Sequence, residues 1–239
     1  MHHVVLEGWS RRTSLLHARE PRVKILALLA FLVALATLPV GLRLAWAGFA
    51  ALLVAGALLA RLPLPALVAR SLVILPFTLA FAAASWLSGD GPRAVALVAK
   101  SYLSAFAVLL VMATTPLPRL LGGAERLGAP RVLVTVIQFL YRYLFVISEQ
   151  AQHMLLASRC RAPIRRRTER SRFQAASGAL AVLFARSFSR ATGIQNAMAA
   201  RGFCGHFPAF SVERIRATDL LFLVVSAGAA ALLRFGVQR

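Results

Sequence analysis

The stretch SYLSAFAVLLVMATTPLP (Ser101–Pro118) runs for about the length of a bilayer span without a single charged side chain. Three other charge-free apolar runs of similar length precede it: Ile25–Leu42, Leu44–Ala60 and Ser71–Gly89. A shorter run, Leu220–Leu233, lies between Asp219 and Arg234, whose side chains can snorkel to the membrane interfaces. This pattern predicts an all-α integral membrane protein with about five transmembrane helices.

The composition is both apolar and basic, with 59% hydrophobic residues and 28 Lys+Arg against 8 Asp+Glu, which gives a formal charge of +20. A membrane protein with positive cytoplasmic loops and a nucleic-acid binder both fit such a charge. The long apolar runs favour the membrane protein, so no nucleic-acid partner is expected. The two cysteines, Cys160 and Cys204, lack disulfide or metal-site spacing and the histidines are scattered, so no metal site is expected either.

Between the fourth and fifth runs, residues 119–216 carry many arginines and no lysine, and two long helical patterns run through them. In the first pattern, Arg131–Ala157, polar residues recur mostly at helical spacing and mark one helix face. They are Arg131, Thr135, Gln138, Arg142, Glu149 and His153. The facing apolar side chains are Val132, Val136, Phe139, Tyr143, Ile147 and Met154. Such a helix suits an interfacial or protein-packed position better than a lipid-surrounded one.

The second pattern, Arg172–Arg201, has a near-heptad apolar seam, which is typical of a helix that packs on a neighbouring helix. The seam consists of Phe173, Ala176, Leu180, Leu183, Ser187, Ala191, Ile194 and Met198. Four arginines fall in one sector about 60° wide. They are Arg172, Arg186, Arg190 and Arg201. The seam and the arginine face together give this segment the form of a docking helix.

The arginines also predict the orientation of the chain. The segment before the first run holds five basic residues and the loop between the second and third runs holds Arg61 and Arg70, whereas the opposite loops carry one arginine each, Arg43 and Arg93. The positive-inside rule therefore places the N-terminus and the arginine-rich helices in the cytoplasm. The run Arg165–Arg167 favours contact with anionic headgroups, so membrane lipid is an expected partner. The chain then divides into N-terminal spans (1–118), a cytoplasmic coupling-helix region (119–216) and a C-terminal span (217–239).

The apolar runs contain no Asp, Glu or His away from their boundaries, although such groups usually mark an ion path. Their absence argues against a self-sufficient transporter, and also against an intramembrane hydrolase, because the serines within the runs lack an activating partner. Packing or backbone hydrogen bonds explain those serines better. Neither Lys24 nor Lys100 stands in a Gly-x4-Gly-Lys-Ser/Thr loop. We therefore expect a non-catalytic chain that binds no cofactor; if the protein uses ATP, a partner holds the ATP and its Mg²⁺.

The two arginine-rich helical patterns end in similar tripeptides, Ser158–Cys160 (SRC) and Ala200–Gly202 (ARG). An arginine near a helix C-terminus is stabilised by the negative end of the helix dipole, and Gly202 can adopt the left-handed cap conformation. A simple helix stop therefore explains the second tripeptide. Arginine also suits bidentate pairing with a partner carboxylate, so docking explains the same residues. On the pattern alone, both explanations stand.

Four stretches carry a resemblance to a known family. They are SLLHAREPRVKIL (Ser14–Leu26), TTPLPRLLGGAERLGAPR (Thr114–Arg131), FLYRYLFVISEQAQHMLLASRCR (Phe139–Arg161) and LFARSFSRATGIQNAMAARGFCG (Leu183–Gly205). They resemble, in order, the first-span motif, the connector helix and the two coupling helices of the T component of energy-coupling factor (ECF) transporters. The resemblance is closest to the cobalt/nickel branch, the CbiQ-like proteins. In the first motif, Glu20 stands where the family usually has aspartate.

The resemblance implies that the arginine at the end of each coupling helix docks in a groove on one of two ATPase subunits and meets acidic groups there. The second motif matches residue for residue, whereas the first matches only at its arginine, because Ser158 replaces alanine and Cys160 replaces glycine. The expected docking residues are Arg159, Arg201, Ser158, Cys160, Ala200 and Gly202, supported by the helix face of Arg172, Arg186 and Arg190.

The resemblance further implies a separate membrane subunit that binds the substrate, with cobalt or nickel as cargo. The chain would then couple ATP-driven motion of the two ATPase subunits to that membrane subunit. The composition fits a second function equally well, a non-transport membrane scaffold that binds anionic lipid or an acidic partner through its arginines. The presence of ATPase subunits in the native complex distinguishes the two.

Overall fold

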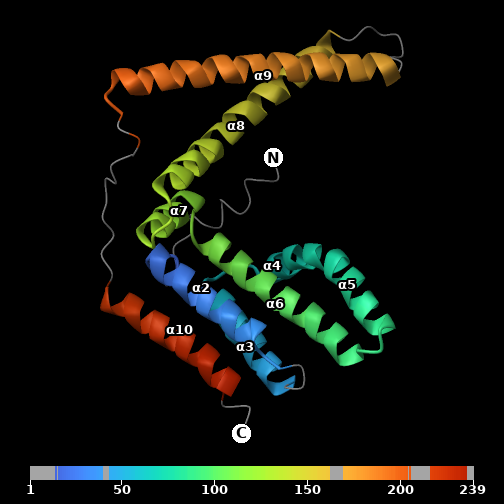
Figure 1. The fold of residues 1–239 in the computed structure, drawn as a ribbon, viewed down its shortest axis with the longest axis vertical. Coiled ribbons are helices and arrows are strands. Elements are labelled where there is room, and N and C mark those ends of the chain that lie inside the picture. Colours follow the sequence, from blue (N-terminus) through green and yellow to red (C-terminus); the bar gives the residue numbers. More distant parts are fainter. Residues whose placement is uncertain are drawn as a thin grey trace. The chain divides into compact units, whose positions relative to one another are not determined.

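The computed structural model describes residues 14, 16–39, 43–161, 169–203, 205 and 216–235. Within this part of the chain the regular elements are helices, as the apolar runs predict, and no strand is present. Contacts divide the chain into two compact units, a first unit of Met1–Gly128 with Ser211–Arg239 and a second unit of Ala129–Phe210 (Figure 1). The first unit includes α7 (Leu117–Arg126), whereas the sequence pattern groups residues from 119 onward with the coupling helices.

The first unit is a helical bundle built around α2. Its elements are α2 (Pro21–Ala36), α3 (Arg43–Leu59), α4 (Leu64–Ser71), the 3-10 turn η1 (Leu72–Ile74), α5 (Leu75–Leu87), α6 (Gly91–Thr114), α7 and α10 (Ala217–Phe235). α2 contacts α6, α7 and α10 (Figure 1). The core contains the edge-to-face pair Phe31 and Phe49, whose ring centroids lie 5.2 Å apart, and Ala230 of α10. The C-terminal helix therefore completes a bundle that begins near the N-terminus.

The first apolar run forms a shorter helix than predicted, because α2 ends at Ala36 and not at Leu42. Pro39 explains this end, since a proline disfavours the helical conformation of the residue before it. Thr37 closes the helix, and its hydroxyl donates to the Val33 carbonyl at 2.7 Å. With 16 and 17 residues, α2 and α3 are about 24–26 Å long, which is less than the ~30 Å hydrocarbon core.

Four segments of the described chain are long and apolar enough to cross a membrane. They are Leu64–Leu87, Gly91–Thr114, Arg131–Cys160 and Ala217–Arg234. Three of them overlap predicted spans, and Ala45–Leu59 is a shorter apolar helix within another. The segment that begins at Arg131 was not predicted to span, because its polar stripe favours an interfacial position. Its apolar content is nevertheless high enough for a membrane span. The chain is thus an all-α protein with several membrane-compatible helices.

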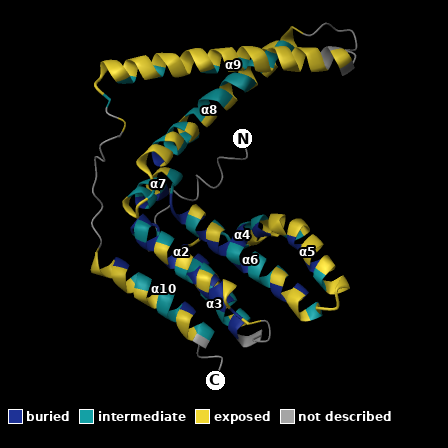
Figure 2. Ribbon diagram, in the orientation of Figure 1, coloured by how far each residue is buried: buried dark blue, intermediate teal, exposed yellow. Residues whose placement is uncertain are grey.

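The segment Leu64–Leu87 changes its helical geometry at η1. Pro76 lacks an N–H group and its ring crowds the Leu72 carbonyl, so the chain tightens into 3-10 geometry there. From η1 onward, large apolar side chains are exposed, among them Val73, Phe77, Trp86 and Leu87 (Figure 2). An apolar face of this kind suits contact with lipid or with another membrane subunit.

The chain has two lysines, and both tie α2 to α6. Lys24, near the start of α2, donates from Nζ to Thr115 Oγ1 at 2.7 Å and to the Thr114 carbonyl at 3.2 Å. Lys100 of α6 donates to two carbonyls at the end of α2, at 2.8 Å each. Each ammonium group therefore meets a helix C-terminus, where unsatisfied carbonyls and the helix dipole favour a cation. The two lysines hold α2 and α6 side by side in opposite directions.

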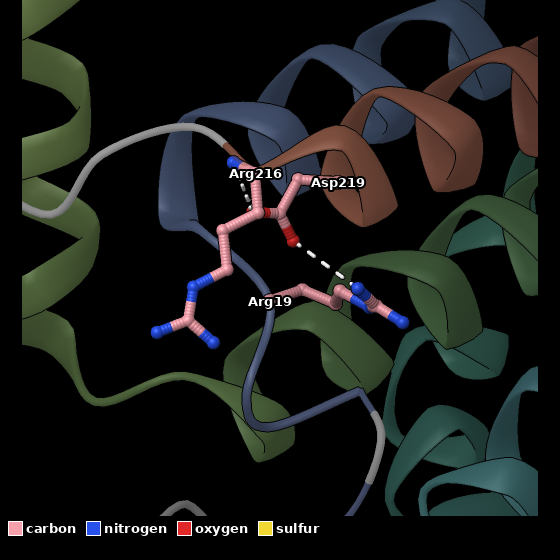
Figure 3. A network of polar contacts seen from close by, with 3 residues as sticks. All are labelled: Arg19, Arg216 and Asp219. Carbon is pink, nitrogen blue, oxygen red and sulfur yellow. Dashed lines mark hydrogen bonds and ion pairs between the residues drawn. The ribbon is translucent and has the colours of Figure 1, made fainter.

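α10 begins with a polar network that joins it to the N-terminal segment (Figure 3). The Asp219 carboxylate accepts a hydrogen bond from the Arg216 backbone N–H at 3.1 Å, and Arg19 Nη1 lies 3.5 Å from Asp219 Oδ1. The contact with Arg216 is one half of a capping box. The prediction that Asp219 snorkels to the membrane interface is therefore wrong. Its partners satisfy it inside the protein, where it is 3% exposed.

The close approach of α7 to the start of α2 is expected to make Gly123 intolerant of a side chain. A Cβ at Gly123 would lie 3.0 Å from Pro21 Cβ and 3.3 Å from the Arg22 backbone nitrogen. Because backbone atoms cannot move aside cheaply, Gly123→Ala should destabilise the protein by about 1–3 kcal/mol. Gly122→Ala, with open space around it, should stabilise α7 by about 0.5–1 kcal/mol. Thermal unfolding in detergent tests this pair, and equal melting temperatures for the two variants would contradict the contact.

Candidate functional site

The second unit contains α8 (Arg131–Cys160) and α9 (Glu169–Ala200), which pack on each other. Grooves of about 850 Å³ and 280 Å³ open on either side of their contact. From α9 the grooves are lined by the seam residues Ala176, Leu180, Leu183, Ser187, Ala191, Ile194 and Met198. From α8 the lining includes Phe139, Tyr143, Ile147 and Met154. The prediction that α9 packs on a neighbouring helix is confirmed, and the neighbour is α8.

Both predicted apolar faces are only partly covered. On α9, Phe173 and Leu180 are 76% and 66% exposed, and on α8, Val132 and Val136 are 73% and 55% exposed. Phe184 and Phe188 of α9, which lie outside the predicted seam, are exposed as well (Figure 2). α9 therefore presents large apolar side chains that α8 does not cover.

α9 ends in a Schellman motif, the two-bond closure typical of glycine-capped helices. The Phe203 N–H donates to the Met198 carbonyl at 3.1 Å, and the Gly202 N–H donates to the Ala199 carbonyl at 3.0 Å. Gly202 has a φ of +71°, the left-handed conformation that glycine adopts without strain. The predicted helix stop at Gly202 is confirmed. Arg201 stands at the cap itself and is exposed, like its neighbour Ala200.

α8 ends differently. The Arg161 N–H donates to the Ala157 carbonyl at 3.1 Å, and Arg161 keeps a right-handed φ of −86°. The helix therefore continues through Cys160, the position at which the family pattern has glycine. Arg159 and Cys160 are exposed, while Ser158 is half-buried and lines the larger groove together with Arg159. Replacement of the glycine changes how the helix ends but leaves Arg159 accessible.

The predicted arginine face of α9 is exposed where the structure describes it. Arg186 and Arg190 are both exposed, and Arg190 also lines the smaller groove. Arg172 belongs to α9, but its side chain lies outside the described residues, as do Arg165–Arg167. The docking role of this face and of the two helix ends stays a prediction.

Substitution of Gly202 is expected to loosen the tip of α9. No atom would touch a Cβ there, so Gly202→Ala should cost only the strain of a left-handed alanine, about 1–2 kcal/mol. Gly193→Ala, inside α9 and also in open space, should stabilise the same helix by about 1 kcal/mol. Amide hydrogen exchange around Phe203 measures the effect. Faster exchange is expected for Gly202→Ala only, and unchanged exchange would show that the cap does not depend on glycine.

The hydrogen bonds of the described serines in the apolar helices indicate a structural role for these side chains. Ser71 Oγ donates to the Val68 carbonyl at 2.8 Å, and Ser104 Oγ donates to the Ser101 carbonyl at 2.9 Å. These are the backbone bonds that the sequence favours over hydrolase chemistry. Among the described residues, no group of three His, Cys, Asp or Glu side chains is arranged to hold a metal ion.

Two buried polar contacts were missed by sequence reasoning, one of Lys24 with Thr115 and one of Asp219 with Arg19. Lys24, Thr115 and Asp219 are each only 3% exposed and lie at the ends of α2, α6 and α10. The available signal was Lys24, one of two lysines in a chain whose other cations are arginines. Glu20, the residue before α2, is 4% exposed and makes no capping hydrogen bond. The aspartate of the family pattern is a better capping residue before a proline.

The fold and the candidate site define an all-α, multi-pass membrane protein with two packed helices that each end beside an exposed arginine. The family model described as CbiQ, cobalt transport protein, matches residues 12–210. Because this match covers most of the chain, the protein belongs to the CbiQ family of cobalt transport proteins.

Two curated proteins show the extent of the similarity. The cobalt transport protein CbiQ of Rhodobacter capsulatus is 29% identical over 147 residues, which cover 61% of this chain and 59% of that protein. An uncharacterized protein of Methanocaldococcus jannaschii is 28% identical over 128 residues, which cover 54% of this chain and 43% of that protein. The chain thus matches less than two thirds of the length of either relative.

Proposed function

We propose that this chain is the transmembrane coupling subunit of an ECF-type importer for cobalt or nickel. The observation that carries the proposal is the pair of packed helices, α8 and α9, whose ends present the exposed side chains of Arg159 and Arg201. Membership of the CbiQ family supports the transport role, and the name of the Rhodobacter capsulatus relative supports cobalt as the cargo.

In the proposed mechanism, each arginine forms a bidentate ion pair with a carboxylate in a groove of one ATPase subunit. ATP closes the two ATPase subunits and moves the docked helix ends. The α8–α9 contact passes this shift on, because packed helices move as discrete elements. The energy comes only from contacts that differ between the ATP-bound and ATP-free states.

In this proposal, other subunits of the complex hydrolyse ATP and bind the substrate. The ATPase subunits hold ATP and Mg²⁺, and a separate membrane subunit binds the metal ion as substrate. This chain is then non-catalytic and binds no cofactor. The positive-inside rule supports a cytoplasmic position for the N-terminus, α8 and α9, on the side where the ATPase subunits work. The exposed apolar side chains of α5 suit lipid or the substrate-binding subunit.

A second candidate function is a membrane scaffold that binds anionic lipid. Phe184 and Phe188 are exposed on the same helix as Arg186 and Arg190, and aromatic and basic side chains together favour the surface of an anionic membrane.

Purification of the native complex separates the two functions. The coupling role predicts two ATPase chains and a further membrane subunit in the complex, and ATP-dependent Co²⁺ uptake after reconstitution. Recovery of the chain without ATPase subunits, with binding to anionic vesicles and no uptake, would overturn the coupling role in favour of the scaffold.

A further inference from the structure

The chain leaves the first unit after α7, at Gly128–Ala129, and returns before α10, at Phe210–Ser211. The exit follows α7, which is joined to α6 through Thr115 and Pro116, and the return leads into α10 at Arg216. We call these two links of the first unit, α6–α7 and the start of α10, the first and the second passage. Lys24 contacts the first passage through Thr115, and Arg19 contacts the second through Asp219 (Figure 3).

The contact at the first passage is buried and specific. Lys24 is 3% exposed, and a buried ammonium group is costly unless it donates hydrogen bonds. Its bonds to the Thr115 hydroxyl and the Thr114 carbonyl meet this need at 2.7 and 3.2 Å. Thr115 has extended backbone angles, φ −144° and ψ 123°, so it lies where the helical path is interrupted. Lys24 therefore holds a point at which the chain could otherwise bend.

The contact at the second passage links charges across the fold. Asp219 is 3% exposed and receives both the Arg216 N–H and the Arg19 guanidinium. Loss of Arg19 would leave a buried carboxylate with its capping bond alone. The start of α10 is therefore held to the segment that also leads into α2.

We propose that Arg19, Lys24 and Asp219 are positioning residues for transport, and that together with Thr115 they form an anchor. The anchor makes the ends of α2, α6 and α10 move together when the second unit moves. Without it, the motion is absorbed at the two passages and does not reach the membrane helices. The inference rests on the proposed coupling function and assigns a role to residues outside the two helix ends expected to dock.

The two lysines provide a matched test in the assembled transporter. Lys24→Met and Lys100→Met each remove an ammonium group that joins α2 and α6, but only Lys24 contacts the link from α6 to α7, the helix after which the chain leaves the first unit. Lys24→Met should lower ATP-driven Co²⁺ uptake per complex by about tenfold while ATP hydrolysis stays within about twofold. Lys100→Met should lower neither by more than about twofold.

A milder pair of variants covers the case in which Lys24→Met fails to assemble. Thr115→Val keeps the shape of the side chain but removes the acceptor of the 2.7 Å bond. Thr78→Val removes a buried hydroxyl that bonds only within its own helical segment, to Ile74 and Leu75. Uptake per complex should fall for Thr115→Val and not for Thr78→Val.

Charge exchange tests the second passage. Arg19→Asp and Asp219→Arg should each lower uptake relative to ATP hydrolysis, and the double variant should recover at least part of the loss. The anchor would be overturned if Lys24→Met and Lys100→Met lost uptake equally, or if the lower uptake were explained entirely by a smaller amount of assembled complex. The proposed coupling function would still stand in either case. Absence of ATP-driven uptake in the unaltered complex would overturn both.

Discussion

Charge reversal at Arg201 is expected to lower ATP-driven cobalt uptake by on the order of a hundredfold or more, as for loss of a buried charge pair at an interface. Arg201 stands at the exposed cap of α9, where Arg201→Glu removes no contact that holds the helix cap, since the cap bonds are made by the backbone. An acidic side chain at a helix C-terminus costs only about 0.3–1 kcal/mol. Helix destabilisation is therefore too small to explain the expected loss. Uptake into proteoliposomes that contain the purified complex measures it.

Arg170→Glu is the matched control. Arg170 is also an exposed arginine of α9, but it lies in the first turn and on the side of the helix opposite the arginine face. The same change of charge there should leave uptake and recovery of the ATPase subunits near normal. Normal uptake by Arg201→Glu, or an equal loss in both variants, would show that the tip of α9 is not a specific docking point.

The second large effect concerns the contact between α8 and α9. Ile194 is half-buried in the smaller groove beside Phe139 and Tyr143. Ile194→Asp removes a half-buried apolar side chain and places a carboxylate in the groove, which Arg190 on the same groove compensates only in part. The change should weaken the α8–α9 contact by about 2–3 kcal/mol and separate the helices. ATP-driven uptake should then be lost, because the seam no longer transmits movement from the helix tips.

Gln195→Asp controls for the added charge, since Gln195 is the next residue and is exposed. Spin labels at the exposed Leu155 of α8 and Phe184 of α9, with both native cysteines replaced, report the distance between the helices. A longer and broader distance distribution is expected for Ile194→Asp alone. If the distance and uptake both stay normal, the seam is not needed for coupling.

The parts of the site that depend on local pattern could be predicted from the sequence. The seam from Ala176 to Met198 follows helical periodicity, and four of its residues are half-buried in the grooves between α9 and α8, namely Leu183, Ser187, Ile194 and Met198. The stop at Gly202 follows from the left-handed conformation that glycine accepts at a helix end. Both features are determined by residues within a few turns of one helix.

The anchor could not be predicted in this way, because its partners lie far apart in sequence. Lys24 is separated from Thr115 by 91 positions, and Arg19 is separated from Asp219 by 200. The hydrophobic pattern indicates that Lys24 and Asp219 border apolar runs, but not which helix ends lie next to each other. The end of α2 was also predicted too late. The apolar run continues to Leu42, but the helix ends at Ala36 because Pro39 disfavours the helical conformation of the residue before it.

A photo-crosslink from the tip of α9 tests the docking of this helix most directly. A photoreactive phenylalanine derivative replaces Ala200, which is exposed beside Arg201, and the native complex is irradiated. Docking predicts a crosslink to a subunit that carries a phosphate-binding loop, and no such crosslink when the same derivative replaces the exposed Gln174 near the start of α9. Crosslinks from position 200 to lipid alone, in a complex that still hydrolyses ATP, would contradict the docking role of Arg201.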